Sequence, residues 1–157
     1  MSERPAATSP ASQLVEQTLD EHGGCMKLVV EVENCLDRHP DHAERWVADL
    51  EGTLTKLIAA MREHMKGEEA GPIFRTLPES YPRLAGPLAR LESEHAELLN
   101  DADAVIDRIR ALRDPEVFEL RELNARTQLF IARFRRHEAA ENEIVLEAYW
   151  DDIGGGD

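Results

Sequence analysis

The sequence has few aromatic side chains, few glycines and no long apolar run. Aromatic residues make up 5% of the 157 positions, and three of the nine glycines stand together at 154–156. No segment shows the alternation and turn spacing of β-strands, so we expect helices throughout. The absence of about eighteen consecutive apolar residues excludes a membrane-spanning helix, and residues 1–10 lack the apolar core of a secretion signal.

Positive charge is also scarce. The chain carries 18 Lys and Arg against 32 Asp and Glu, a formal net charge of -14. A surface of that sign repels the phosphates of nucleic acids and anionic lipids. We therefore expect neither nucleic acid nor a membrane surface among its partners, and the sequence identifies no protein partner. Most of the carboxylates are expected to solvate exposed helix faces.

Cysteine is limited to Cys25 and Cys35. The two residues fall in one predicted helix, where a rise of ~1.5 Å per residue separates them by about 15 Å. That distance is too large for a disulfide, and free thiols suit a reducing compartment. We therefore expect a cytoplasmic protein.

The composition that is present favours one compact all-α domain over residues 1–157, with 1–9 and 151–157 as disordered tails. At 42% hydrophobic residues, the chain can bury a core. We expect four helices joined by short connections, which gives an up-down-up-down antiparallel four-helix bundle. The segment 71–82 is expected to be a loop or a short turn.

Capping and breaking residues predict where these helices begin and end. Ser9 and Pro10 are expected to open the first helix, and Pro40 to end it. Asp41 is expected to cap the second helix, which ends at Gly71-Pro72. The third helix is expected to begin between residues 83 and 87, and Asp114-Pro115 to separate it from the fourth.

Each predicted helix carries an inward stripe at helical spacing. In the fourth helix the stripe alternates steps of three and four, as in the seam of an antiparallel bundle. In chain order the predicted inward residues are Leu14, Val15, Leu19, His22, Met26, Val29 and Leu36; Trp46, Leu50, Leu57, Met61, His64 and Glu68; Leu84, Leu88, Leu91, His95, Leu98, Ala102 and Ile109; and Leu123, Thr127, Phe130, Phe134, His137, Glu141, Ile144 and Ala148.

One histidine on each stripe is expected to lie at the same level of the bundle. His22, His64, His95 and His137 are separated by 42, 31 and 42 residues, and their distances from the helix connections agree. In an up-and-down bundle these spacings place all four nearer the end that carries the termini. The other two histidines, at positions 39 and 42, fall ~25 Å or more away at the opposite end.

Two glutamates accompany these histidines. Glu68 and Glu141 follow His64 and His137 by four residues, which places each pair on one helical face. Six polar groups in one apolar layer all need partners, and a pair of metal ions would satisfy them together. Nitrogen and oxygen donors suit iron or manganese, with zinc as a possible substitute, and disfavour copper(I) or thiolate-bound zinc. A metal-free bundle with a structural polar layer is the alternative.

This pattern resembles the hemerythrin-like (HHE cation-binding) family. The segments HMKGEEAGPIF and HEAAENEIVLE are similar to the family's second and fourth helix signatures, and the resemblance covers residues 12–148. It implies a non-haem di-iron centre, two irons per chain with an oxo or hydroxo bridge, in a four-helix bundle. The ligands that it implies are His22, His64, Glu68, His95, His137 and Glu141.

The sequence departs from the oxygen-carrying members of that family at one point. Carriers have a second histidine on the third helix, four residues from the first, where this chain has Leu91 or Leu99. The departure favours bacterial hemerythrin-like proteins, including the iron–sulfur repair group and sensors of iron or oxygen. The additional cysteine-containing domain that is usual in the repair proteins is not in this sequence.

The implied centre leaves several functions open. Four imidazoles, two bridging carboxylates and one bridging oxygen group fill ten of twelve coordination positions, so about one per iron remains for water, oxygen, nitric oxide or peroxide. The first hypothesis is a protein that binds or responds to such a ligand or to iron. The alternative is a redox enzyme for peroxide removal, or for iron–sulfur cluster repair by iron donation. Glu69 and Glu94 could orient ligands from outside, or could simply be solvated.

Overall fold

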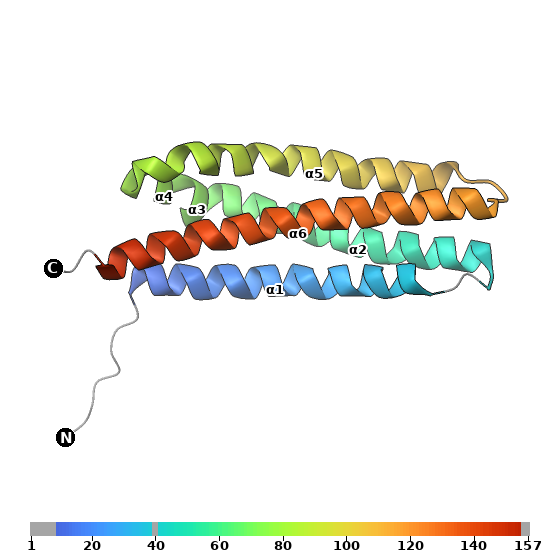
Figure 1. The fold of residues 1–157 in the computed structure, drawn as a ribbon, viewed down its shortest axis with the longest axis horizontal. Coiled ribbons are helices and arrows are strands. Elements are labelled where there is room, and N and C mark those ends of the chain that lie inside the picture. The colour runs from blue at the N-terminus through green and yellow to red at the C-terminus, as the bar shows by residue number, and fades with distance from the viewer. Residues whose placement is uncertain (1–8, 39–40, 155–157) are drawn as a thin grey trace, which may run out of the picture.

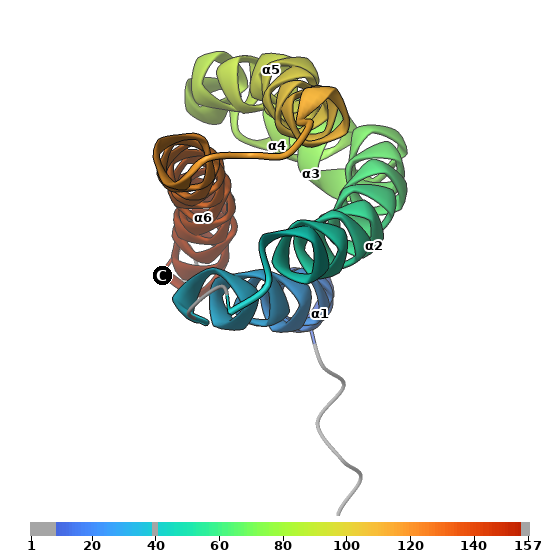
Figure 2. The same ribbon diagram turned by 90° about the vertical axis from the view of Figure 1, so that its right-hand side faces the viewer.

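Four long helices make up most of the chain in the computed structural model, which describes residues 9–38 and 41–154. They are α1 (Pro10–Asp37), α2 (Ala43–Ala70), α5 (Ala85–Ala111) and α6 (Val117–Gly154). They lie side by side, and each packs against two others in the circular order α1, α2, α5, α6 (Figures 1 and 2). No β-strand occurs in the described residues, so the all-α prediction is confirmed there.

The first helix begins as predicted. The backbone N–H of Ser12 donates to the Ser9 side chain at 3.1 Å, and Pro10 occupies the first helical turn. The prediction that Asp41 caps α2 is wrong, because the residue at the cap position is His42, which makes no side-chain capping hydrogen bond. The predicted break at residue 40 falls outside the described residues.

Gly71 ends α2, as predicted. A Cβ at this position would approach the Gly67 carbonyl oxygen to 2.9 Å, so the close turn requires glycine. The connection that follows is more helical than expected. It contains α3 (Pro72–Arg75), α4 (Leu77–Ser80) and the 3₁₀ helix η1 (Pro82–Leu84). Prolines lie in the first turn of each, where a missing N–H breaks no helical hydrogen bond.

The ends of the chain and the last connection differ partly from expectation. Helix α6 runs to Gly154, so helix covers residues 151–154 of the segment that we expected to be a tail. Residues 1–8 and 155–157 lie outside the described part. Asp114, in the connection between α5 and α6, has φ 44°, a conformation that Asp adopts more readily than most residues.

No helix in the described residues is both long and apolar enough to cross a bilayer.

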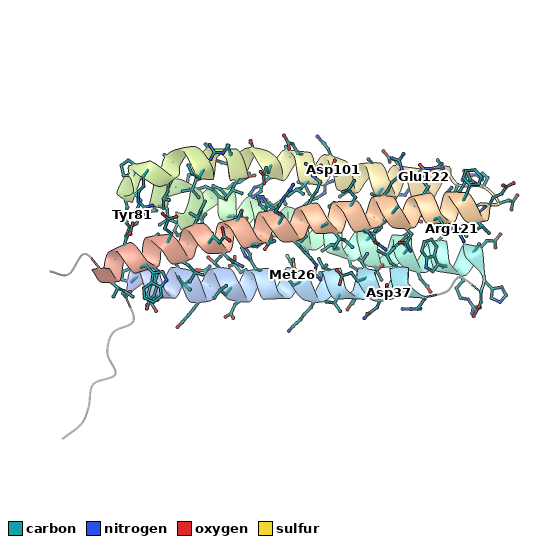
Figure 3. The ribbon with its side chains drawn as sticks, in the orientation of Figure 1. Met26, Asp37, Tyr81, Asp101, Arg121 and Glu122 are labelled. Carbon is teal, nitrogen blue, oxygen red and sulfur yellow. The ribbon has the colours of Figure 1, made fainter. Side chains whose placement is uncertain are left out.

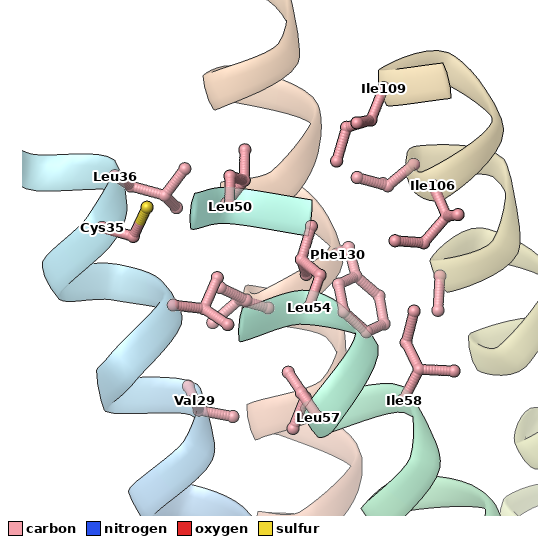
Figure 4. Close-up of a cluster of buried hydrophobic side chains, with 14 of the residues drawn as sticks. Val29, Cys35, Leu36, Leu50, Leu54, Leu57, Ile58, Ile106, Ile109 and Phe130 are labelled. Carbon is pink, nitrogen blue, oxygen red and sulfur yellow. The ribbon is translucent and has the colours of Figure 1, made fainter. Parts of the chain in front are cut away.

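The hydrophobic core has two parts. The larger part fills the half of the molecule away from the termini and includes the fully buried Leu50, Leu54 and Leu57 (Figure 4). The smaller part lies toward the termini, around Phe74 and Leu88. Between the two parts, all four long helices contribute buried polar side chains: Thr18, His22, Glu68, His95, His137, Glu138 and Glu141.

The inward stripes are largely as predicted. Every residue of the α6 stripe is buried. On α1, however, Leu19 is 45% exposed, so its assignment to the core is wrong. Thr18 and His22 take the inward positions on that part of the helix. Met26, one turn after His22, lies near the middle of α1 in Figure 3, so the polar layer sits slightly toward the termini.

Candidate metal centre

The four histidines from the four long helices meet at one level, as the spacing predicts. The ring centroids of His22 and His64 are 4.9 Å apart, and those of His95 and His137 are 5.0 Å apart. The layer therefore holds two pairs of imidazoles, one between α1 and α2 and the other between α5 and α6. His42 stands far from it, at the start of α2, and His39 lies outside the described residues.

Glu68 spans the two histidine pairs. Its Oε1 lies 3.0 Å from His22 Nε2 and 2.7 Å from His64 Nε2. Its Oε2 lies 3.5 Å from His95 Nε2. One oxygen therefore faces each pair, which is the placement that a carboxylate shared by two metal ions requires.

Glu141 spans the same pairs from the opposite helix and is fully buried. Its Oε2 lies 3.1 Å from His22 Nε2. Its Oε1 lies 2.9 Å from His137 Nε2 and 3.3 Å from His95 Nε2. All six side chains that the sequence singles out as metal ligands are thus brought together.

Polar atoms that lack hydrogen-bond partners are concentrated in this layer. Among the described residues, the buried side-chain atoms without a partner are His64 Nε2, His137 Nε2, Glu68 Oε2, Glu141 Oε2 and both carboxylate oxygens of Glu138. Some of these atoms lie close to a polar atom but at angles that do not make a hydrogen bond. His64 Nε2, for example, lies 2.7 Å from Glu68 Oε1. A buried ionised group without a partner costs several kcal/mol. Cations among these nitrogens and oxygens would satisfy them, and the donor types fit iron, manganese or zinc.

A third buried carboxylate belongs to the layer and was missed by the sequence reasoning. Glu138 is 3% exposed. One donor atom from each of His22, His64, Glu138 and Glu141 lies within 4.8 Å of the others, and His95, His137 and Glu141 form a second such group. Its position directly after His137 could have indicated it. The inward face of a helix is wider than a single stripe, so a residue next to the stripe of α6 can also be buried.

Polar side chains on neighbouring helices contact the outer nitrogen of each histidine. Glu69 on α2 lies 2.9 Å from His95 Nδ1, and Glu94 on α5 lies 2.9 Å from His137 Nδ1. These contacts support the orienting role suggested for both glutamates.

The other two histidines have similar outer partners, which the sequence reasoning did not single out. Glu21 on α1 lies 3.7 Å from His64 Nδ1, and Asn142 on α6 lies 2.7 Å from His22 Nδ1. Around the bundle, each long helix therefore supplies a side chain that orients the histidine of the next. Such contacts fix the ring so that Nε2 points into the layer.

Without metal, the carboxylates of the layer raise the pKa values of its four histidines. Burial alone would lower the pKa of His22, but the nearby carboxylates of Glu141, Glu68 and Glu138 raise it to about 10. Against the same effect of burial, Glu138 and Glu68 raise the pKa of His64 to about 10. The pKa values of the other two histidines are also raised.

Glu141 shows the opposite shift. Burial would raise its pKa, but close contacts with the imidazoles of His137, His22 and His95 hold that pKa well below its usual range. Without metal, the raised histidine pKa values favour protonated imidazoles that face carboxylates. Because metals bind deprotonated imidazole, an incoming cation must displace these protons.

Cys25 lies one turn from His22 and packs in the larger hydrophobic cluster, and neither group of close donor atoms includes it. Burial, together with the charges of Glu138, Glu68 and Glu21, raises the pKa of its thiol to about 12. A thiol in its protonated form is a poor nucleophile, and the burial of Cys25 among hydrophobic side chains is that of a packing residue. Cys25 and Cys35 are both free and buried.

Comparison with known proteins gives one match. A family model described as "Hemerythrin HHE cation binding domain" matches residues 13–149. No curated protein matches the chain. No solved structure matches it.

Proposed function

This chain belongs to the hemerythrin HHE cation-binding domain family, and on that premise we propose that its buried polar layer holds two metal ions, with iron as the physiological metal. The ligands would be His22, His64, Glu68, His95, His137 and Glu141. Glu68 and Glu141 would be shared between the ions. The up-down-up-down antiparallel four-helix bundle expected from the sequence is part of the same proposal.

One observation carries the proposal. The buried polar atoms without partners, in the part of the chain that the structure describes, all belong to this one layer. They are imidazole Nε2 atoms and carboxylate oxygens, both of which are ligands for iron and manganese. A purely structural polar layer would instead be expected to satisfy its own hydrogen bonds.

A bound pair of irons would supply a redox-active centre for a small ligand such as oxygen, nitric oxide or peroxide. The protein's part is to exclude bulk water and to admit only a small molecule, because the side chains of the layer are buried between two hydrophobic clusters. Leu91 and Leu99 stand where carriers have their additional histidine. That difference supports a responsive or redox role of the bacterial type over oxygen transport. The two free cysteines support a place in the cytoplasm.

The ligand can be identified with anaerobic diferrous protein mixed separately with oxygen, nitric oxide and hydrogen peroxide. We expect at least one of them to change the near-ultraviolet and visible spectrum at one equivalent per chain. Many equivalents of peroxide consumed per chain would establish an enzyme, whereas a stoichiometric change that reverses when the ligand is removed would establish a binding or sensing protein. Iron-loaded protein whose spectrum is indifferent to all three ligands would contradict this part of the proposal.

A further inference from the structure

Glu138 is a buried carboxylate for which the six-ligand centre has no role. Both of its oxygens are inaccessible to solvent and lack a hydrogen-bond partner. Its nearest polar neighbours include two histidines of the layer: Oε2 lies 3.1 Å from His22 Nδ1, and Oε1 lies 3.5 Å from His64 Nε2. A carboxylate that only packs against the layer would be costly in this position.

The contact with His64 determines which way the carboxylate acts. Nε2 is the nitrogen with which His64 faces Glu68, so it points into the layer. Glu138 Oε1 therefore lies on the inner side of His64, while its Oε2 contacts the outer Nδ1 of His22. Glu21, Glu69 and Glu94, in contrast, contact outer Nδ1 atoms and no inner nitrogen. Those three glutamates are also about half exposed, and Glu138 is not.

From these contacts, and resting on the proposed function, we infer that Glu138 is a third carboxylate ligand, specific to the metal ion between His22 and His64. That ion would have two imidazoles, one oxygen from each shared carboxylate, and Glu138. The ion between His95 and His137 would have two imidazoles, Glu141 and the second oxygen of Glu68. The two positions are therefore unequal.

This asymmetry deepens the proposed function, because it assigns the site of the exogenous ligand. Glu138 takes the coordination position that would otherwise be open on the ion beside His22 and His64. The remaining open position belongs to the ion beside His95 and His137. The small ligand is therefore bound on the side of α5 and α6, where the Phe74 ring packs edge-on against His95 at a centroid distance of 5.3 Å.

The test is an anaerobic iron(II) titration of four proteins against a competing chelator, with bound iron counted by mass spectrometry. They are the wild type, Glu138→Gln, Glu94→Gln as a change in an outer histidine partner, and Glu143→Gln as an exposed control on the same helix. We expect two tight sites in the wild type. We expect Glu138→Gln to weaken one of them by at least about 100-fold and to leave the other, because it removes a ligand rather than an outer partner.

The controls separate a ligand from an outer partner. Glu94→Gln is expected to keep both irons with an affinity loss of roughly 10-fold, and Glu143→Gln to match the wild type. Glu138→Asp, which keeps the charge but shortens the side chain, is expected to repeat the loss at one site, and circular dichroism of each metal-free variant checks its fold. Two irons bound by Glu138→Gln with wild-type affinity, or with a loss no larger than that of Glu94→Gln, would overturn the assignment.

A double-mutant cycle locates the effect of Glu138. In a His95→Ala background, Glu138→Gln is expected to remove the remaining tight iron, whereas in a His64→Ala background it is expected to add little. The reverse pattern would place Glu138 on the other ion and so overturn the inference. A wild-type chain that binds no iron would instead refute the proposed function itself, so the two failures are distinguishable.

Discussion

Replacing Glu141 with alanine is expected to remove both metal ions from the chain. Glu141 is fully buried, and its two oxygens contact His22, His95 and His137 at 2.9–3.3 Å. No other side chain of the described residues contacts both histidine pairs so closely except Glu68. Loss of a ligand shared by two ions should lower the affinity for each ion by at least about 100-fold. Mutation of a side chain that only orients a ligand lowers metal affinity by at most about that much.

The measurement is iron per chain after purification and dialysis, together with the unfolding temperature, for Glu141→Ala and His42→Ala. His42 is exposed at the opposite end of the molecule, so its replacement should leave metal content and unfolding temperature at the wild-type values. Glu141→Gln, which keeps the side-chain volume, separates loss of the ligand from loss of packing. Wild-type iron stoichiometry in both Glu141 variants would remove this residue from the site.

Removing the metal from the wild-type protein is expected to lower its unfolding temperature greatly. An ion held at about a thousand times its Kd stabilises the folded state by about 4 kcal/mol. In a domain of this size, 1 kcal/mol corresponds to roughly 2–4 °C, so two ions correspond to a loss on the order of 15–30 °C. Differential scanning calorimetry of loaded and chelated protein measures this difference. An equal unfolding temperature in both would show that the layer stabilises the fold without metal.

The size of that difference should depend on pH. In the metal-free protein, the pKa values of His22 and His64 are raised from 6.5 to about 10. The stability that their protonation contributes is fully present below about pH 6.5 and is lost as the pH rises toward 10. In the loaded protein the same imidazoles are held by metal, so the gap between loaded and chelated protein should widen over this range. Glu141→Ala, treated with chelator in the same way, should show little gap at any pH.

The sequence predicts the long helices well because each has a regular inward stripe. The α6 stripe is buried throughout, and the Ser9 cap and the glycine at position 71 mark real helix ends. The single level of the four histidines follows from helix lengths and short connections. These are local or periodic properties, which a single sequence carries directly.

The details that depend on neighbouring helices were less predictable. Leu19 fits a helical stripe but is exposed, because the direction of the stripe is set by the packing of α1 against α2 and α6. The segment after Gly71 contains three prolines, which suggest a loop, yet each lies in the first turn of a short helix. Proline both ends and begins helices, and only the surrounding contacts decide which.

The candidate site shows the same division. The histidine–glutamate pairs at a spacing of four were recognisable because residues four apart share a helical face. Glu138, Glu21 and Asn142 were not recognised, since each approaches the histidine of another helix. In a chain with 32 acidic residues, sequence alone does not separate a buried carboxylate from the many that are solvated.

The central claim is that this layer binds two ions, and the most direct measurement is the metal content of freshly purified protein by mass spectrometry, with an ultraviolet–visible spectrum of the same sample. We predict about two irons per chain and a charge-transfer band in the near ultraviolet. Fully folded protein that contains no metal, and takes up none when offered iron(II) without oxygen, would contradict the account and leave the four histidines as a structural layer.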